Sequence, residues 1–412
     1  MTNNSNEVLI VGSGFAGLVT AITLRKYDIP LKIFEATKSP TSIGGSVTMF
    51  PNSMKVLRLI GVADEVVDSG VEIEKVKFQN NFGKHLVYRP QGIKSIYGES
   101  TISIRRYKLY EILLNKAKEL GIEIFYGKKV VKINENNSYV VLGFEDKSKY
   151  TGSILIGCDG INSTVRKHIL NQNIMPEYSG LLYVGGFVNN KELIKELNLK
   201  SNTQYVSVGP TSWFAYGHID NTENRSPTLL WFCYLANPNR LSKEELILLE
   251  DKKILDKVFS FHKNWHQPIQ KLIENTDELC KANVSDIIEI ESWYNGRSII
   301  IGDAAHAINP ISGQGAGTAM EDGYLLAKLL QKHNNDFKLA FKFIVMLRKK
   351  RTTLMGKKAR NSSNRTTIPL NKNIVILRNI LFSLVTYFTP EKVLNKFLSY
   401  DVEDELEKIK YL

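Results

Sequence analysis

A glycine-rich turn near the start of the chain has residue types suited to binding a dinucleotide. Gly12-Ser-Gly-Phe-Ala-Gly17 fits G-x-G-x-x-G and directly follows the apolar run VLIV. In such a turn the first glycine permits a tight bend, the second lets backbone N–H groups approach a pyrophosphate, and the third allows close packing of helix on strand. Glu35 ends the next predicted strand, where an acid accepts hydrogen bonds from ribose hydroxyls. This pattern predicts a site for an adenine dinucleotide with an unphosphorylated ribose.

Two later motifs place an aspartate directly after a predicted strand. The second motif is Gly157-Cys-Asp-Gly-Ile-Asn-Ser-Thr-Val-Arg166, which follows the strand-like ILI. The third begins with Gly302-Asp-Ala-Ala-His306 after the strand-like III and continues through Pro310 to Gly-Gln-Gly315. Open α/β sheets bind their ligands at the carboxyl ends of the strands, so the three motifs are expected to share one site.

The elements that position these motifs follow from hydrophobic periodicity. Residues 8–35 predict a strand, a helix from Phe15 to Lys26 and a second strand. Helices are also predicted at 51–61, 106–120, 242–275 and 316–332, and strands at 122–125, 129–157 and 298–302. Between 180 and 235, strand-like runs alternate with turn residues, which predicts an antiparallel sheet. The predicted fold class is α/β, a Rossmann-like domain with an inserted antiparallel β-sheet domain and a C-terminal helical segment.

Composition favours a folded protein of a reducing compartment. The 412 residues are 43% hydrophobic and 23% charged, close to globular averages, and the formal net charge is +12. Three widely spaced cysteines leave one unpaired in any disulfide scheme, and no signal peptide is apparent, so we expect a cytoplasmic protein. The longest apolar stretch, 374–388, is short and contains Arg378, which disfavours a membrane span.

The three motifs together resemble those of single-component FAD-dependent aromatic monooxygenases. This family includes salicylate, hydroxybenzoate and urate hydroxylases and tetracycline-inactivating enzymes, and the resemblance runs from about residue 8 to 333. It implies a discontinuous FAD-binding domain (1–75, 100–178 and 280–340). A β-rich substrate domain (76–99 and 179–279) and a C-terminal helical region (341–412) complete the predicted division.

The resemblance implies FAD as cofactor and assigns roles to individual positions. The first motif would hold the ADP half of FAD, Glu35 the ribose, Arg106 the pyrophosphate, and Asp303 the ribityl and phosphate groups. The second motif would serve both FAD and NAD(P)H. N–H groups near Gly315 would face the flavin N1–C2=O edge, where a helix N-terminus stabilises negative charge. The implied cofactor-binding residues are Gly12, Gly14, Phe15, Ala16, Gly17, Glu35, Arg106, Asp159, Gly160, Arg166, Gly302, Asp303, Pro310, Gly313, Gly315, Ala316 and Gly317.

The chain departs from the family pattern at a few positions. Cys158 stands where alanine is usual, Ser46 where glycine is common, and Gly317 where asparagine is frequent. None of these changes removes a charged cofactor contact. We expect Gly317 to make the loop beside the flavin more flexible.

The implied reaction is hydroxylation of an aromatic or polyketide-like small molecule. NAD(P)H would reduce FAD, O₂ would add to form a C4a-hydroperoxide, and its terminal oxygen would pass to the substrate. Aromatic residues alternate along 213–218 and 230–234, so one face of these strands is expected to line the substrate pocket. Tyr216 and His218 are the candidate catalytic residues, as bases that deprotonate a phenol. The alternatives are a flavin-dependent reductase or halogenase on the same fold, and a non-catalytic redox sensor.

Other features receive simpler interpretations. His262 and His266 lie four residues apart but lack the H-E-x-x-H glutamate, so no metal site is predicted and both are expected on a helix surface. His306 is expected to pack within its loop. For the basic segment 342–365 and the apolar residues that follow, a solvated face and a C-terminal helix packed over the substrate domain are favoured over a membrane-surface helix. No nucleic-acid partner is expected, and the chain is predicted to be a monomer or homodimer. The substrate and the choice of NADH or NADPH stay open.

Overall fold

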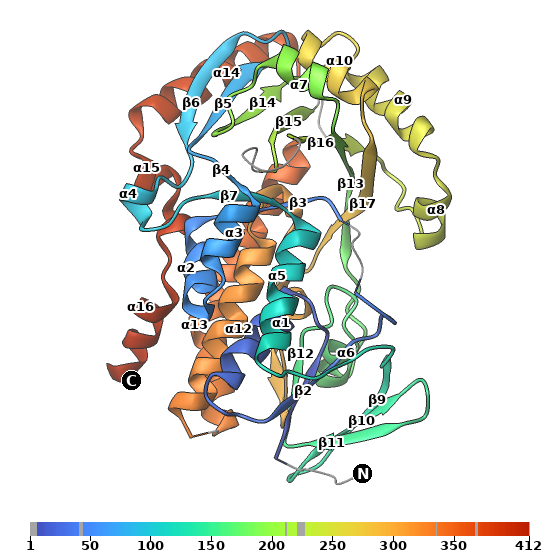
Figure 1. The fold of residues 1–412 in the computed structure, drawn as a ribbon, viewed down its shortest axis with the longest axis vertical. Coiled ribbons are helices and arrows are strands. Elements are labelled where there is room, and N and C mark those ends of the chain that lie inside the picture. Colours follow the sequence, from blue (N-terminus) through green and yellow to red (C-terminus); the bar gives the residue numbers. More distant parts are fainter. Residues whose placement is uncertain are drawn as a thin grey trace.

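A mostly parallel sheet surrounded by helices forms one end of the molecule, and a large, mostly antiparallel sheet forms the other (Figure 1). The computed structural model describes residues 6–40, 44–210, 212–220, 227–334, 336–366 and 370–411. The predicted α/β fold class is confirmed, with an antiparallel sheet and a C-terminal helical segment.

The first sheet has six strands, and β1 and β12 lie at its centre. Strand β1 pairs in parallel with β2 on one side and with β12 on the other, and β12 pairs in parallel with β19. The carboxyl ends of β1, β12 and β19 therefore meet at one edge, and these are the strands that precede the three motifs. In order across the sheet the strands are β18 (Tyr294–Asn295), β19 (Ser298–Ile300), β12 (Ile154–Gly157), β1 (Val8–Val11), β2 (Leu31–Phe34) and β8 (Ile124–Phe125).

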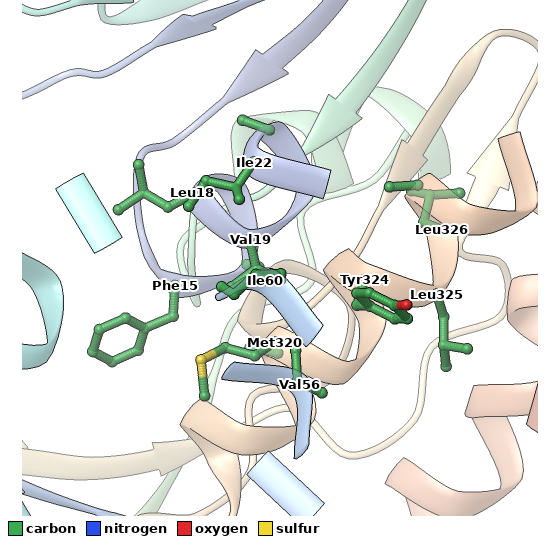
Figure 2. Packing of buried hydrophobic residues seen from close by; sticks show 14 of the residues in the cluster. Phe15, Leu18, Val19, Ile22, Val56, Ile60, Met320, Tyr324, Leu325 and Leu326 are labelled. Atoms are coloured by element: carbon green, nitrogen blue, oxygen red, sulfur yellow. The ribbon is translucent and has the colours of Figure 1, made fainter. Parts of the chain in front are cut away.

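Helices cover this sheet and bury its apolar residues. Helix α1 packs along α12, and α2 joins them, as Figure 2 shows for Leu18, Ile22, Val56 and Met320. Ten of the eleven residues of α1 are buried, which explains its small residues. The helices of this half are α1 (Phe15–Arg25), α2 (Pro51–Ile60), α3 (Ala63–Ser69), α5 (Arg106–Glu119), α6 (Thr164–Leu170), α11 (Asp303–His306), α12 (Gly315–Lys332), α13 (Phe337–Thr366) and α16 (Val402–Glu407).

The second large sheet has seven strands and is antiparallel except where β14 pairs in parallel with β5. Its strands in order are β17 (Glu278–Asp286), β13 (Glu177–Val188), β16 (Leu229–Ala236), β15 (Trp213–His218), β14 (Thr203–Val208), β5 (Lys75–Asn80) and β6 (His85–Pro90). The other helices are α4 (Lys94–Tyr97), α7 (Lys191–Leu197), α8 (Lys243–Leu248), α9 (Asp251–His262), α10 (Gln267–Glu274), α14 (Lys372–Phe388) and α15 (Glu391–Leu394).

Two three-stranded sheets complete the fold. One consists of β3 (Ser46–Met49), β7 (Ile102–Arg105) and β4 (Val71–Glu72) and lies where the two halves meet (Figure 1). The other consists of β9 (Val130–Glu135), β10 (Val140–Phe144) and β11 (Lys149–Gly152) and lies near the amino terminus. Among the described residues, no helix combines the length and the apolar character needed to cross a bilayer.

Most predicted elements are confirmed with shifts of one or two residues. The predicted helices at 15–26 and 316–332 are α1 and α12, and the strand-like runs between 180 and 235 are β13 to β16. Helix α7 interrupts these runs and was not predicted. It is short, and Asn190 begins it by accepting a hydrogen bond from the Leu193 backbone N–H at 3.1 Å.

The burial of Leu325 on α12 generates a stability prediction. Leu325 is completely buried in this cluster (Figure 2), so Leu325→Ala leaves a cavity and lowers the free energy of unfolding by about 2–5 kcal/mol. Denaturant unfolding measures the change. Leu354→Ala on α13 is the matched control, because the Leu354 side chain is 48% exposed, and it should have little effect. Equal losses in the two variants would contradict the packing described here.

Candidate active site

Close backbone contacts shape the glycine-rich turn after β1. Gly12 has a φ of +101°, and a Cβ there would lie 2.3 Å from the carbonyl oxygen of Cys158. A Cβ at Gly17 would lie 2.0 Å from the carbonyl oxygen of Gly12, so α1 approaches the turn as only glycine permits. Gly14 differs, because no atom lies within 4 Å of its Cβ position and no side chain caps the helix there. The first N–H groups of α1 are therefore accessible to a ligand.

Glu35 follows β2 and is bonded to this turn. Its Oε2 accepts hydrogen bonds from the backbone N–H and the hydroxyl of Ser13, both at 2.9 Å. Its Oε1 accepts from the backbone N–H and the hydroxyl of Thr37, at 2.9 and 3.1 Å. Burial opposes ionisation, but these four hydrogen bonds outweigh it and lower the pKa of Glu35. The sequence did not single out Ser13 or Thr37, which fix this carboxylate beside the start of α1.

Arg106 places a positive charge at the start of α1. The central carbon of its guanidinium lies 5.2 Å from the ring centre of Phe15, the first residue of α1. Its backbone N–H donates to the carbonyl oxygen of Gly45 at 2.9 Å, which ties α5 to the residues before β3. The Arg106 side chain is thus near the accessible N–H groups of α1.

The second motif uses its aspartate to start a helix. The Asp159 carboxylate accepts hydrogen bonds from the Ser163 hydroxyl at 2.5 Å and from the N–H groups of Thr164 and Val165 at 2.7 and 3.2 Å. Burial raises the pKa of Asp159 in spite of these bonds. Gly160 has a φ of +75°, which favours glycine, and no atom lies within 4 Å of its Cβ position.

Arg166 points into the protein and not towards a ligand. Its side chain is buried, and its guanidinium donates to the carbonyl oxygens of Ile161 at 2.7 Å, Ala304 at 2.9 Å and Ile174 at 3.1 Å. These bonds connect the second motif to the third. The geometry favours a positioning role for Arg166, and a direct cofactor contact by this residue stays a prediction.

The third motif brings Asp303 to the start of α11. Gly302 has a φ of +59°, and its Cβ position lies 3.1 Å from the Cβ of Ala16, so the third motif packs directly on α1. The Asp303 side chain is exposed, and it has no hydrogen bond or ion pair with any described residue. Beyond its exposed carboxylate, Asp303 is surrounded by protein that displaces water. This desolvation raises the pKa of Asp303, while the charges of His306 and Arg106 act to lower it.

The loop after Asp303 leads into α12. Pro310 is exposed and begins a single 3₁₀ turn, and Gly313 ends it with a φ of +66°. A Cβ at Gly313 would lie 3.1 Å from the Phe50 ring. Helix α12 then starts at Gly315, with Ala316 and Gly317 in its first turn and no acidic residue there. The expectation that Gly317 loosens the loop is wrong. A Cβ at Gly317 would lie 2.1 Å from the Ser53 hydroxyl, so this glycine permits close packing of α12 on α2.

Behind this loop lies a buried cluster of charges. Glu321 and Asp322 on α12 are completely buried. Asp322 accepts from the Arg348 Nε at 2.6 Å and from the Gly302 backbone N–H at 3.0 Å, and its Oδ2 lies 2.5 Å from the His306 Nε2. Burial opposes the charge of Asp322, yet His306 and Arg348 lower its pKa to about 2.

Glu321 extends the cluster towards the Pro310 loop. Its carboxylate pairs with Arg348 at 2.6 Å and with Arg351 at 3.2 Å, and it accepts from the Asn52 amide at 2.6 Å. The Asn52 amide also donates to the Gln314 side chain at 3.3 Å. The interpretation of segment 342–365 as a solvated face is therefore wrong for Arg348 and incomplete for Arg351. The signal in the sequence was the acidic pair in the otherwise small and apolar run GAGTAMEDGYLLA.

A cavity of about 600 Å³ lies between the Pro310 loop and one face of the seven-stranded sheet. Trp213, Phe232 and Tyr234 line it from β15 and β16, and no carboxylate is among its described lining residues. The register of the strands puts these side chains on one face of the sheet. Ala215, two residues after Trp213, pairs with Phe232 on one side and with Val206 of β14 on the other. Further lining residues come from the Pro310 loop, α13, the end of α15 and the segment after it: Pro310, Ile311, Gly313, Gln314, Met355, Lys358, Leu394, Asn395 and Phe397.

Tyr216 and His218 lie on the opposite face of this sheet and do not line this cavity, so their catalytic role stays a prediction. The Tyr216 hydroxyl accepts from the Gln79 amide at 2.7 Å, and Tyr216 packs in a core with Trp231 and Trp265. His218 Nε2 lies 3.2 Å from the Leu199 carbonyl oxygen. Burial raises the pKa of Tyr216 and lowers that of His218. Alternation along β15 separates both residues from Trp213.

The prediction that His262 and His266 lie on a helix surface is also wrong. His262 is completely buried and its Nδ1 donates to the Val258 carbonyl oxygen at 2.7 Å. His266 precedes α10, and its Nε2 lies 2.8 Å from the Ser207 hydroxyl. In the described parts of the chain, no group of three or more His, Cys, Asp or Glu residues is arranged to hold a metal ion.

The fold and the three clustered motifs define a dinucleotide-binding α/β protein of the flavoprotein kind. The chain matches the family described as FAD binding domain over residues 5–336. It therefore belongs to the FAD binding domain family, which confirms the resemblance and identifies FAD as the family's cofactor.

Several similar proteins are named as monooxygenases or hydroxylases. The chain is 27% identical to aurachin C monooxygenase/isomerase of Stigmatella aurantiaca, over 78% of this chain and 80% of that protein. It is 26% identical to 6-hydroxynicotinate 3-monooxygenase of Pseudomonas fluorescens, over 82% and 86%. It is 27% identical to salicylate hydroxylase of Pseudomonas putida, over 78% and 76%.

Solved structures share the fold. HpxO of Klebsiella pneumoniae, complexed with FAD and uric acid, superposes with a TM-score of 0.80 at 21% identity and covers 96% of each chain. The tetracycline destructase Tet(51) superposes with a TM-score of 0.66 at 18% identity, over 94% of this chain and 99% of its own.

The residues present fit FAD. The start of α1 offers uncapped N–H groups with open space at Gly14, and Asp303 offers a carboxylate with no described partner. Beside the first turn of α12, the buried Asn52 Oδ1 and Ser53 Oγ have no hydrogen-bond partner within the described ranges. Polar groups left in this way are expected where a ligand completes the hydrogen bonding.

Asp303 can be tested by an isosteric substitution. Asp303→Asn removes the charge without breaking a described hydrogen bond, and we expect FAD affinity to fall about 10- to 100-fold, because charge-assisted hydrogen bonds are lost. Flavin fluorescence titration measures the affinity. Asp68→Asn, at an exposed position on α3, is the control and should bind FAD normally. Unchanged affinity in Asp303→Asn would remove Asp303 from the site.

His262 generates a pH prediction. Burial lowers its pKa to about 4, whereas in the unfolded chain it titrates near about 6.5. Between these two pH values the unfolded chain binds a proton at His262 that the folded chain does not. The contribution of His262 to the free energy of unfolding is therefore fully present above about pH 6.5 and is lost as the pH decreases towards 4. His262→Phe should reduce the dependence of the free energy of unfolding on pH by up to about 1.4 kcal/mol per pH unit, measured by urea unfolding. His85→Phe, at an exposed histidine, should retain it. Identical slopes in wild type and His262→Phe would refute the assignment.

Proposed function

We propose that this protein is an FAD-dependent monooxygenase that uses NAD(P)H and O₂ to hydroxylate a small aromatic molecule. The relatives named as monooxygenases and hydroxylases support the reaction type. The mechanistic route expected from the sequence is part of this proposal.

The observation that carries the proposal is the place of the cavity. One wall is the loop of the third motif, at Pro310 and Gln314, and the opposite wall is the aromatic face of the sheet, at Trp213 and Phe232. A compound in this cavity would lie between the cofactor-binding loop and a group of aromatic rings that contact one another edge-on or at a tilt. Its volume of about 600 Å³ is in the usual range for sites that bind small molecules.

The residues that would hold FAD follow from the geometry of the site. The N–H groups at the start of α1 would bind the pyrophosphate with help from Arg106, and Glu35 would share its hydrogen bonds with the ribose. Asp303 would accept hydrogen bonds from ribityl hydroxyls. The uncapped N–H groups of Gly315 to Gly317 would stabilise negative charge on the flavin edge.

The protein itself supplies position and exclusion of water. Bound FAD, reduced by NAD(P)H, supplies the electrons and the activation of O₂. Trp213, Phe232 and Tyr234 would orient an aromatic ring, and polar lining groups such as Arg89 and Gln204 would select its substituents. Arg89 is held by hydrogen bonds to the side chain of Asn395 and the Leu394 carbonyl oxygen, so its position is fixed before a substrate arrives.

Activity can be tested directly on the FAD-loaded protein. A panel of phenols, N-heteroaromatic acids, purines and polyketide-like compounds is incubated with NADH or NADPH, and oxidation of the nucleotide is followed together with product mass. We expect at least one compound to accelerate oxidation and to gain one oxygen atom. Protein that never acquires a flavin spectrum when FAD is added would refute the proposal. A flavin-bound form in which no compound stimulates NAD(P)H use would support the redox-sensor alternative instead.

The face of the sheet that contacts substrate can be tested with two variants of β15. Trp213→Leu should raise KM about three- to tenfold while FAD affinity stays normal, because an aromatic contact in the cavity is lost. Tyr216→Phe, on the covered face, should leave kcat and KM within about twofold of wild type. A strong loss of kcat in Tyr216→Phe, with an altered pH profile, would restore Tyr216 as a catalytic candidate.

A further inference from the structure

Helix α14 presents an apolar face to solvent. Leu377 is 57% exposed and Phe388 is 75% exposed, and their spacing places them on one side of the helix. A soluble surface helix normally shows the reverse, with its apolar stripe turned to the core. The exposed apolar residues of α14 are Ile374, Ile376, Leu377, Ile380, Leu381, Leu384, Val385, Tyr387 and Phe388, here called the α14 apolar face.

The side of α14 that faces the protein is more polar. The Arg378 guanidinium donates to the Gly209 carbonyl oxygen at 3.0 Å, between β14 and β15. Thr386 is buried there, and the Phe382 ring lies 4.8 Å from the ring of Phe78, a lining residue of the cavity. These contacts fix α14 to the sheet and leave its apolar side turned to solvent.

The size of the α14 apolar face calls for a partner. The face extends over the whole helix and continues to Val393 in α15, which is 66% exposed. Soluble monomers rarely leave contiguous apolar patches of this extent in water, and such patches mark protein or membrane contacts. Figure 1 shows α14 at the end of the molecule beside β6, with its outer side uncovered.

Charge identifies the kind of partner. Residues 337–390 contain twelve Lys and Arg and no Asp or Glu, which equals the formal net charge of +12 of the whole chain. Four of these cations form ion pairs with acids elsewhere in the chain: Arg348, Arg351, Lys357 and Arg360. Exposed cations remain at both ends of the apolar face: Arg365 before it, and Lys392 and Lys396 after it. The first acid after α14 in the sequence, Glu391, accepts a hydrogen bond from the Gly92 backbone N–H at 3.1 Å.

We propose that the α14 apolar face docks on the surface of an anionic lipid bilayer, with the helix in the plane of the interface. Apolar side chains would enter the acyl boundary while Arg365, Lys392 and Lys396 contact lipid phosphates. Because α14 is fixed to the sheet by Arg378 and Phe382, docking would place the cavity next to the lipid. The proposal does not depend on the catalytic activity.

A second copy of this chain fits the same face less well. Pairing two α14 faces would bring the cations at their ends together, with no exposed acid in residues 337–390 to match them. Like charges across an interface oppose association, whereas anionic lipid neutralises them.

Vesicle binding tests the proposal. The FAD-loaded full chain, without substrate or NAD(P)H, is sedimented with phosphatidylcholine vesicles that contain about a quarter phosphatidylglycerol. We expect binding that weakens at high salt and with pure phosphatidylcholine. The variant Leu377→Gln/Leu381→Gln/Leu384→Gln should bind at least about tenfold more weakly. In the variant Lys392→Glu/Lys396→Glu, vesicle binding should depend much less on the anionic lipid.

The control changes exposed apolar residues elsewhere. Ile247→Gln/Leu248→Gln on α8 alters side chains that are 71% and 78% exposed, and it should bind vesicles as wild type does. All variants change exposed positions, so normal FAD content and thermal unfolding are expected. The proposal is overturned if wild type fails to bind anionic vesicles at low salt, or if the triple variant binds equally well. A wild-type dimer that the triple variant dissociates, without vesicle binding, would instead assign the face to self-association.

Discussion

The buried carboxylates of Glu321 and Asp322 require cations inside the protein, and this requirement organises the cofactor-binding half. Arg348 and Arg351 on α13 supply the charges, and His306 and the Gly302 backbone N–H supply further hydrogen bonds. Loss of one partner from such a cluster costs about 3–5 kcal/mol, because the remaining charge is left buried without compensation. The cluster thereby fixes α12, α13 and the third motif to one another, at the edge of the sheet where the ligand site lies.

This fixed edge explains the relation between the cofactor site and the cavity. The Asn52 amide contacts both Glu321 and Gln314, so the charge cluster reaches the loop that forms one wall of the cavity. The opposite wall belongs to the seven-stranded sheet. In the family this architecture is combined with FAD, and the uncapped start of α1 and the exposed Asp303 carboxylate fit that cofactor. The arrangement of the loop and the aromatic sheet face supports the proposed oxidation of an aromatic compound.

Sequence reasoning succeeded where local chemistry determines structure. The Gly12–Gly17 turn, β1 and α1 were predictable because apolar periodicity and glycine geometry act over a few residues. Prediction failed where contacts between residues far apart in the sequence determine the structure. Alternation along β15 predicted two faces but could not tell that α9 and α10 cover the face of Tyr216 and leave Trp213 to the cavity. Likewise, the partners of Arg348 lie on another helix, and the outward turn of α14 depends on contacts with β5 and the β14–β15 loop.

The source of the transferred oxygen tests the account most directly. The FAD-loaded protein is supplied with NAD(P)H, an accepted aromatic substrate and ¹⁸O₂, and the product is analysed by mass spectrometry. A monooxygenase places one atom of O₂ in the product and the other in water, so the account predicts one ¹⁸O per product molecule and an equal amount of NAD(P)H consumed. Product oxygen derived from water, or nucleotide consumption that ends only in hydrogen peroxide for every compound that binds, would contradict it.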